Sequence, residues 1–264
     1  MTTANKGTAL ITGASTGIGA VYADRLAKRG YDLILVARDK TKLQSVADAI
    51  KAKYANRVEI ISADLTAKAD LHSVEARLRS DESISLLVNN AGLGATAKLI
   101  DADPDDLEKM IYLNVTALTR LSSAVVPGFV ARGNGVVINI ASIVALAPEM
   151  LNGAYSGSKA YVVNFTQSMH HELSDKGIKV QAVLPGAIDT PFWDKSGLPV
   201  HNLPSQIVMT PENLVDASLA GFDKGELITI PSLPDIKEWE ALDAARKVLT
   251  PNLSRAVPAS RYLN

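Results

Sequence analysis

The chain has 264 residues, with 27 Lys plus Arg against 28 Asp plus Glu, and its formal net charge is −1. That balance gives no electrostatic reason to expect nucleic acid or an anionic membrane as a partner. The chain has no Cys, which excludes disulfides, iron–sulfur clusters, zinc–thiolate sites and a cysteine nucleophile. A hydrophobic fraction of 47% and a charged fraction of 21% are ordinary for a folded protein.

The N-terminal residues and the apolar runs predict where the protein resides. Met1 to Lys6 is too short for a signal peptide, and an apolar run ending in a glycine-rich turn follows at once. No segment reaches the roughly 18 uninterrupted apolar residues that a membrane span needs, since Gly135–Ala147 contains Asn139 and Ser142. We therefore expect a cytoplasmic protein that does not bind a membrane.

Short apolar runs alternate with helical patterns along the chain. The runs are mostly apolar throughout rather than alternating, which is typical of strands buried on both faces of a parallel sheet. The predicted strands are Thr8–Thr12, Asp32–Ala37, Arg57–Ala63, Leu86–Asn89, Val136–Ala141, Lys179–Leu184 and Leu227–Ile230. The predicted helices are 18–29, 39–53, 67–80, 104–131, 154–176 and 211–222, with one further helix at 235–249. This order predicts an α/β fold with a doubly wound parallel sheet and helices on both faces.

The acidic cluster Asp103-Pro104-Asp105-Asp106 is interpreted as the start of a helix rather than a metal site. We expect no metal site in the chain. No Pro/Gly/Ser-rich linker divides the sequence, but its pattern loosens from Pro231 onward. The expected organisation is therefore a cofactor-binding and catalytic domain at 1–230. A C-terminal extension at 231–264 would pack on the same domain or on a partner subunit.

A glycine-rich turn follows the first predicted strand. It reads Gly13-Ala14-Ser15-Thr16-Gly17-Ile18-Gly19 and leads directly into a helical pattern. Glycines allow a tight turn and close approach of the backbone to a pyrophosphate, and a helix N-terminus attracts phosphates. The spacing is G-x3-G-x-G, not G-x-G-x-x-G, so the turn alone is consistent with a nucleotide site or with a plain strand-to-helix connection.

The end of the second predicted strand bears on which nucleotide would bind. A ribose 2′-hydroxyl is usually held by an acid about 20 residues after the glycines, and a 2′-phosphate by an Arg. Here Ala37 stands at the expected position of the acid, and Arg38 follows it. Arg38 can bind a phosphate through paired hydrogen bonds, with Ser15 as an additional hydroxyl contact. We therefore predict NADP(H), although Arg38 could also be a solvated residue.

Tyr155 and Lys159 are four residues apart, so on a helix they project from the same face. A Tyr and a Lys at this spacing are common by chance, but other residues support a site. Ser142 follows a predicted buried strand, and the segment beginning Asn89-Asn90 follows another. Both would lie at the carboxyl edge of the sheet, where open α/β sheets bind ligands.

Together these motifs resemble the short-chain dehydrogenase/reductase family, in its single-domain branch. The resemblance rests on Thr12–Gly19, Asn89–Gly92, Asn114, Ser142, Tyr155-x3-Lys159 and Pro185-Gly186, which occur in the family's order. It covers residues from about 8 to 230 and leaves the chain after Pro231 unexplained. The resemblance implies a Rossmann-like sheet of about seven strands and an NADP(H)-dependent oxidoreductase that acts on CH–OH groups.

The resemblance also implies the roles of individual residues. Tyr155 would be the general acid/base, Ser142 would hold the reacting oxygen, and Lys159 would bind the nicotinamide ribose and lower the pKa of Tyr155. Asn114 would support a water in a proton relay. The implied cofactor contacts are Gly13, Ser15, Thr16, Gly17, Ile18, Gly19, Arg38, Asp64, Leu65, Asn90, Ala91, Gly92, Tyr155, Lys159, Pro185, Gly186 and Thr190.

Electrostatics make the Tyr–Lys pairing reasonable. The pKa of a free Tyr is ~10. For a Tyr to act as an acid/base at neutral pH, its pKa must fall by roughly two to three units. An ammonium about 4 Å away, at an effective dielectric constant of about 20, supplies on the order of 4 kcal/mol. Desolvation opposes this effect.

The expected substrate is a largely apolar ketone or aldehyde, or the corresponding secondary alcohol. The implied substrate contacts are Ser142, Val144, Met150, Tyr155, Phe192 and Trp193, and Lys195 is the only basic residue in this region. An NAD-linked alcohol or sugar-alcohol dehydrogenase is an alternative, as is a non-catalytic NADPH-sensing protein. By resemblance, the helices at 104–131 and 154–176 would pair between subunits, which implies a homodimer or homotetramer.

Overall fold

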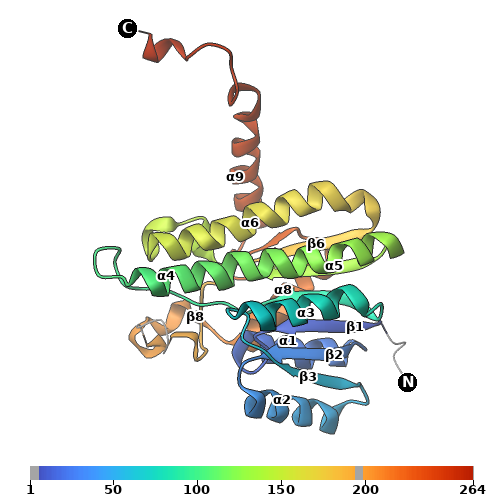
Figure 1. Cartoon of the computed structure of the whole chain (residues 1–264). Helices are drawn as coiled ribbons and strands as arrows, with labels where there is room; N and C mark the ends of the chain where they lie inside the picture. The colour runs from blue at the N-terminus through green and yellow to red at the C-terminus, as the bar shows by residue number, and fades with distance from the viewer. Residues whose placement is uncertain (1–5, 194–198, 264) are drawn as a thin grey trace. The chain divides into compact units, whose positions relative to one another are not determined.

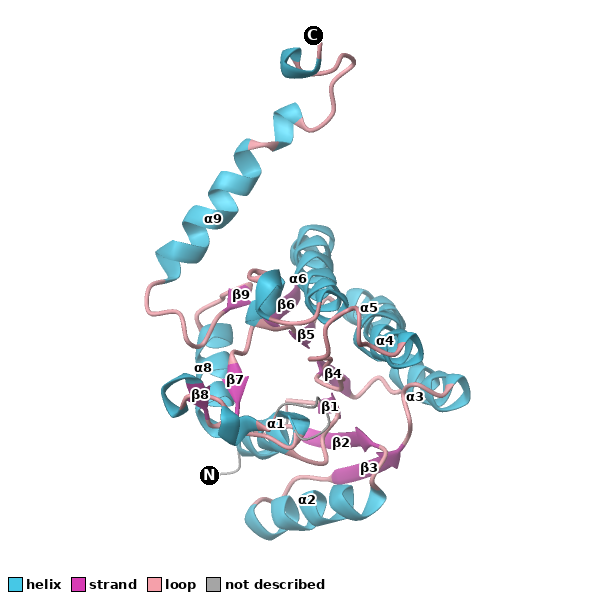
Figure 2. Cartoon of the chain, turned by 90° about the vertical axis from the view of Figure 1, so that its left-hand side faces the viewer, coloured by secondary structure: helices cyan, strands magenta, loops and turns pink. Residues whose placement is uncertain are grey.

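We describe the protein from a computed structural model, which covers residues 6–193 and 199–263. Its main sheet is parallel (Figure 1), and its seven strands have the order β3-β2-β1-β4-β5-β6-β9 (Figure 2). These strands are β1 Thr8–Thr12, β2 Asp32–Ala37, β3 Val58–Ser62, β4 Ile84–Asn89, β5 Gly135–Ile140, β6 Ile178–Val183 and β9 Ile228–Thr229. The predicted fold class is confirmed.

Helices cover both faces of the sheet (Figure 2). One face packs against α1 Gly17–Lys28, α2 Lys40–Lys53 and α8 Pro211–Asp223. The other packs against α3 Lys68–Ser80, α5 Leu118–Arg132 and α6 Gly153–Leu173. In β1, Ala9 and Ile11 join the first of these cores and Leu10 joins the second. Because both faces are covered, the strands are apolar at nearly every position.

The helix starts agree with the sequence interpretation. The side chain of Asp103 accepts a hydrogen bond from the Asp105 amide at the start of α4 Pro104–Ile111. Thr210 caps α8 in the same way, through the amide of Asn213. A side-chain acceptor at this position satisfies an amide that the helix itself leaves unpaired. The acidic cluster at 103–106 is therefore a helix cap.

The predicted helix at 104–131 differs from a regular helix. A π-helical turn, Tyr112–Ala117, joins α4 to α5 within one continuous helix. The whole stretch, Pro104–Arg132, is long and apolar enough to cross a membrane by length and composition alone. Less than half of its most apolar window is buried in the protein. Core helices of soluble proteins satisfy the same criterion.

Two short strands were not predicted. They are β7 Ala187–Ile188 and β8 Val208–Met209, which pair in parallel as a separate small sheet. They lie on either side of the segment 189–207, of which residues 194–198 are outside the described part. With two residues each, these strands are too short to produce a periodic pattern.

The chain divides into two compact units, Met1–Pro231 and Ser232–Asn264. The second unit contains α9 Ile236–Val248, which Asp235 caps by accepting from the Lys237 amide. Several of its apolar side chains are exposed, among them Leu242 and Leu253. The role of this C-terminal extension remains a prediction.

Candidate active site

The glycine-rich turn lies where the strand order reverses. The chain adds β2 and β3 on one side of β1 and then returns to place β4 on the other side. The turns after β1 and β4 are therefore neighbours at the carboxyl edge, which is the usual ligand-binding position in this architecture. Ser15, Thr16, Gly17 and Ile18 are partly exposed there.

Glycine is required at three positions of this turn. Gly13 and Gly17 have φ values of 66° and 53°, in the left-handed region that favours glycine. At Gly19, an added Cβ would lie 2.4 Å from the carbonyl oxygen of Gly13. The side chain of Thr16 makes no capping hydrogen bond to α1 within the described structure. The first turn of α1 can therefore offer its amides to a phosphate.

Thr12 and Asn90 fasten this turn to β4. The Thr12 hydroxyl accepts hydrogen bonds from the Asn90 and Ala91 amides, both at 3.0 Å, and donates to the Val88 carbonyl at 3.3 Å. The Asn90 amide group donates to the carbonyls of Thr12 at 2.9 Å and Gly13 at 3.2 Å. The Asn90 side chain therefore points into the turn itself. Thr12 was not predicted as a site residue, although its position just before Gly13 was the available signal.

Arg38 lies at the end of β2 with its side chain half exposed. One of its guanidinium nitrogens is 3.9 Å from a carboxylate oxygen of Asp64. Burial raises the pKa of Asp64, but hydrogen bonds from Thr66 and the charge of Arg38 outweigh it and hold the pKa below its usual value. A contact of 3.9 Å between exposed groups is weak, so Arg38 can turn toward another anion.

Ser142 and Tyr155 form the reactive part of the site. Ser142 lies two residues beyond the end of β5, and its hydroxyl donates to the Pro185 carbonyl and accepts from the Val144 amide, both at 3.4 Å. Tyr155 is in the first turn of α6, and its phenol is hydrogen-bonded to Ser142. Ser142 and Tyr155 are 8% and 6% exposed. The structure thus brings together the two residues that the sequence placed thirteen positions apart.

Lys159 lies beside this pair but makes its hydrogen bond elsewhere. Its amine donates to the Ile140 carbonyl at 3.0 Å and is 5.9 Å from the centre of the Tyr155 ring. Burial lowers the pKa of Lys159 to about 8. Burial also raises the pKa of Tyr155 to about 12, against the lowering effect of the bond to Ser142.

The expected lowering of the Tyr155 pKa by Lys159 is therefore absent from the site as the structure shows it. That expectation assumed that the Lys159 ammonium lies about 4 Å from the Tyr155 phenol, in a medium of intermediate dielectric constant. The amine instead bonds a backbone carbonyl, and the phenol lies in an apolar cluster, so that desolvation dominates. In this state Tyr155 is a proton donor at neutral pH.

Asn114 lies in the π-helical turn and is 1% exposed. Its side-chain oxygen accepts from the Leu93 amide, and its nitrogen donates to the Leu93 carbonyl, both at 2.9 Å. The same nitrogen is 3.1 Å from the Ser158 hydroxyl. Asn114 thus holds the chain just after Gly92. Gly92 in turn lies close to Lys159, because a Cβ added to Gly92 would be 3.6 Å from the Lys159 amine. Its predicted role in a water relay stays a prediction.

The segment after β6 closes the other side of the site. Pro185 accepts from the Ile143 amide at 3.0 Å as well as from Ser142. Gly186 is next in the chain and is followed by β7. The Thr190 methyl lies 2.9 Å from the position of a Cβ on Gly17. The two predicted cofactor segments, at 13–19 and 185–190, therefore meet in the structure.

An apolar cluster surrounds Tyr155. Its buried members are Met110 and Val144. The partly buried side chains packed against it are Leu93, Ala95, Leu107, Ile143, Leu151, Ala154 and Phe192. The Tyr155 and Phe192 ring centres are 6.2 Å apart.

Other predicted contacts occupy different positions. Trp193 is 9% exposed, and its indole nitrogen donates to the Ile188 carbonyl at 2.8 Å, so it anchors the segment after β7. Met150 is 57% exposed and lies outside the buried part of the cluster. The side chain of Leu65 belongs to the core on the α3 side. Lys195 lies outside the described residues.

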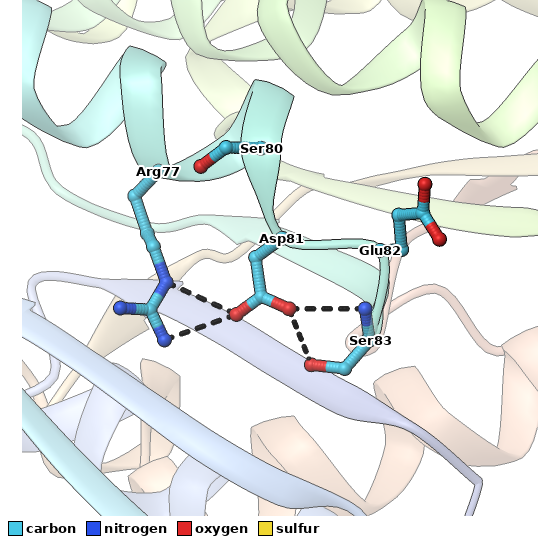
Figure 3. Close-up of a pocket in the computed structure, with 5 residues that line it drawn as sticks. All are labelled: Arg77, Ser80, Asp81, Glu82 and Ser83. Carbon is cyan, nitrogen blue, oxygen red and sulfur yellow. Dashed lines mark hydrogen bonds and ion pairs between the residues drawn. The ribbon is translucent and has the colours of Figure 1, made fainter.

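A separate surface hollow lies at the end of α3, lined by Arg77, Ser80, Asp81, Glu82 and Ser83 (Figure 3). Arg77 donates to Asp81 at 3.0 Å, and Asp81 accepts from the amide and hydroxyl of Ser83. Because α3 ends just before β4 begins, the hollow lies at the sheet edge opposite Ser142 and Tyr155. These polar groups satisfy one another. In the described part of the chain, no group of three or more His, Asp or Glu could hold a metal ion.

Comparison with known proteins identifies the family. The family model described as short chain dehydrogenase matches residues 7–199. This chain belongs to the short-chain dehydrogenases. The membership expected from Tyr155, Lys159 and the glycine turn is confirmed, and with it the assignment as an oxidoreductase.

Solved structures resemble nearly the whole chain. A short-chain dehydrogenase from Sphingobium yanoikuyae, in complex with NADPH, is 48% identical with a TM-score of 0.94; the match covers 97% of this chain and 99% of that one. A bulky-bulky ketone specific alcohol dehydrogenase from Comamonas testosteroni is 43% identical with a TM-score of 0.91, covering 98% of this chain and 100% of that one.

Curated relatives match a shorter part of the chain. A very-long-chain 3-oxoacyl-CoA reductase from Anas platyrhynchos is 37% identical over 80% of this chain and 67% of its own length. The protein of the same name from Bos taurus is 35% identical over 71% of this chain and 63% of its own length. The matched region thus leaves a third or more of these relatives uncovered.

Proposed function

We propose that this short-chain dehydrogenase reduces a largely apolar ketone or aldehyde with NADPH, and in reverse oxidises the secondary alcohol, with Tyr155 as general acid/base. The observation that carries the proposal is the buried grouping of Ser142, Tyr155 and Lys159 at the carboxyl edge of the sheet. Buried titratable groups with shifted pKa values in such a position are typical of catalytic sites.

The residues of the turn fit a dinucleotide that carries a 2′-phosphate. A Cβ on Gly19 would meet the carbonyl of Gly13, so the tight turn that leads into α1 needs glycine there. The first turn of α1 then offers its amides to a pyrophosphate. Arg38 is half exposed and only weakly paired, and the residue before it is the neutral Ala37. The NADPH complex of the Sphingobium yanoikuyae protein supports the same choice. When bound, the nicotinamide supplies the hydride.

The protein supplies the proton and holds the carbonyl. Reduction adds a hydride to the carbonyl carbon and a proton to its oxygen. Tyr155, whose pKa burial raises to about 12, is protonated at neutral pH and can supply that proton. The Ser142 hydroxyl, already bonded to that phenol, can donate to the same oxygen. Lys159, with its pKa lowered to about 8, lies beside Tyr155 and can return the proton that the phenol gives up.

The surroundings of Tyr155 favour a substrate with bulky apolar groups. The cluster around the phenol combines aliphatic side chains with the ring of Phe192. Leu146 and Met150 add exposed apolar surface just beyond the buried residues. An apolar pocket with few polar groups binds mainly through burial of apolar area. The specificity of the Comamonas testosteroni enzyme for bulky-bulky ketones supports this class.

The test is NADPH oxidation, followed by absorbance, with diaryl ketones, a 3-oxoacyl thioester and a ketose as substrates. We expect turnover with the apolar ketones and little with the sugar. Tyr155→Phe should bind NADPH normally, measured by fluorescence, and lose turnover by at least a hundredfold. Turnover of that variant near the wild-type rate would refute the role of Tyr155. Equal use of NADH and NADPH would refute the role of Arg38.

We also propose that the protein is a homo-oligomer that pairs through the helix Pro104–Arg132. The apolar window of this helix is less than half buried within one chain, which supports a second copy as the cover for its outer face. Light scattering on the purified protein tests this proposal. A monomer at micromolar concentration would contradict it.

A further inference from the structure

Asn152 lies immediately before α6 and is 6% exposed. Its side-chain oxygen accepts from the amides of Ala154 at 2.8 Å and Tyr155 at 3.3 Å. Its side-chain nitrogen donates to the Ala97 carbonyl at 2.6 Å. One buried amide thus contacts both the backbone of Tyr155 and a segment more than fifty residues earlier in the chain.

The segment that Asn152 holds forms part of the apolar wall near Tyr155. It is the loop between β4 and α4, in which Leu93 and Ala95 pack against the Tyr155 cluster. Within this loop the side chain of Asn114 holds Leu93, and that of Asn152 holds Ala97. Shortly after Ala97, Leu99 and Ile100 are 77% and 89% exposed, so little packing holds the loop beyond that point.

The two functions of Asn152 make different chemical demands. A helix cap needs only an acceptor, and Ser or Asp supplies one as well as Asn does. The bond to Ala97 needs a donor that reaches a carbonyl, and only an amide offers a donor and an acceptor at the required distance. Capping alone therefore does not require Asn, whereas the combination of both contacts does.

We propose that Asn152 is a positioning residue that fixes the segment 93–97, part of the apolar wall of the substrate site, relative to Tyr155. Through its oxygen it sets the backbone of the proton donor, and through its nitrogen it sets the wall against which an apolar substrate lies. The proposal rests on the proposed function and adds a determinant of substrate binding to it. Loss of the tether should weaken binding of bulky substrates, whereas loss of the cap should also slow the chemical step.

Substitutions at this position separate the two contacts. Asn152→Ser keeps an acceptor for the cap but cannot reach Ala97, so KM for a diaryl ketone should rise about tenfold with kcat within twofold. Asn152→Ala removes both contacts, so kcat should fall about tenfold as well. Asn152→Asp keeps the cap and places an oxygen against the Ala97 carbonyl, so it should resemble the Ser variant in KM. NADPH affinity should not change in any of the three.

The control is Asp103→Ser, which exchanges one cap for another at the far end of the same loop. It should leave KM and kcat at wild-type values. Wild-type KM in Asn152→Ser would overturn the proposal. An equal loss of kcat in the Ser and Ala variants would overturn it too, because the cap that Ser retains would then contribute nothing to the chemical step.

Hydrogen exchange of the ligand-free protein tests the tether without activity. Amides at 94–103 should exchange at least tenfold faster in Asn152→Ser than in the wild type, while those of α6 should not change. Unchanged exchange in the loop overturns the proposal. If no carbonyl is reduced by the wild type, the proposed function fails, and this measurement still decides whether Asn152 holds the loop.

Discussion

The amine of Lys159 lies 5.9 Å from the centre of the Tyr155 ring while it donates to the Ile140 carbonyl at 3.0 Å. Both side chains are buried, and burial moves their pKa values in opposite directions because each group is less stable when charged. At pH 7 Tyr155 is neutral, and Lys159, with a pKa of about 8, is still mostly protonated. The site therefore holds its proton on the phenol and can take up or release one at the amine.

The shifted pKa of Lys159 predicts a pH dependence of stability. In the folded protein the pKa is about 8, and the usual value for the unfolded chain is 10.5. Between these values the unfolded chain binds more protons, so the free energy of unfolding should rise with pH. The Lys159→Met variant has no titratable side chain at this position and serves as the reference. The wild type should therefore gain stability relative to the variant from pH 8 to pH 10.5, measured by urea unfolding at each pH. Parallel curves for the two proteins would contradict this pKa.

The close contact at Gly19 predicts that Gly19→Ala damages the cofactor turn. The added Cβ would lie 2.4 Å from the Gly13 carbonyl oxygen, so the backbone must shift, which costs about 1–3 kcal/mol. We expect NADPH affinity to fall at least tenfold, by fluorescence titration, together with a lower Tm. The matched control is Gly157→Ala in α6, where nothing lies within 4 Å, and which should raise stability by roughly 0.5–1 kcal/mol. Normal affinity in Gly19→Ala would show that the turn can adapt.

The position of Arg38 predicts the cofactor preference. Hydrogen bonds to charged groups contribute about 1.5–3 kcal/mol, so Arg38→Ala should weaken NADPH binding roughly tenfold to a hundredfold and leave NADH binding unchanged. Calorimetry with both cofactors measures this difference. Arg57→Ala is the control, because Arg57 is 88% exposed and pairs with Asp32 at the opposite end of β2. An equal loss of affinity for NADPH and NADH would mean that Arg38 does not contact the 2′-phosphate.

The buried carboxylate of Glu75 should stabilise the contact between α3 and α5. It is 2% exposed and accepts hydrogen bonds from Arg120 of α5 and Arg79 of α3. Burial raises its pKa, but the bonds from Arg120 and Arg79 outweigh it and hold the pKa below 4.5. Its contribution should therefore be present above pH 4.5 and lost as the pH falls through the folded value.

Glu75→Gln should lower the free energy of unfolding by about 1.5–3 kcal/mol at pH 7. The control is Glu59→Gln, which breaks an exposed pair with Arg77 and should cost under about 1 kcal/mol. Urea unfolding measures both variants. Equal effects of the two substitutions would mean that burial adds nothing at Glu75.

The fold follows from the sequence because both sheet faces are covered. Continuous apolar runs identified all seven strands of the main sheet, although β4 begins at Ile84, two residues before the predicted start at Leu86. The π-helical turn around Asn114 and the pair β7–β8 depend on tertiary contacts that leave no periodic signal. The predicted strand at 227–230 shortened to Ile228–Thr229, since β9 is an edge strand that pairs with β6 alone.

The site was predictable only where residue type and spacing determine position. Ser142 and Tyr155 are joined in the structure, and Thr190 lies against Gly17. The direction of the Tyr155 pKa was not predictable, because it depends on the apolar cluster packed around the phenol. The tether from Asn152 to Ala97 was missed for the same reason: the two residues are distant in sequence, and an Asn before a helix indicates only a cap.

The turn Tyr112–Ala117 allows one helix to serve two cores. Met110, before it, packs with Tyr155 and Val144, whereas Leu121, after it, packs in the core on the α3 side. A π-helical turn is wider than an α-helical one. It holds one residue more than an α-helical turn for about the same rotation, so deleting one residue there would regularise the pitch and keep the two halves nearly in phase. What would change is the place of Asn114, which this turn carries and which bonds both backbone groups of Leu93. An evolutionary path that straightened this helix would therefore have to refasten the pocket wall at the same time.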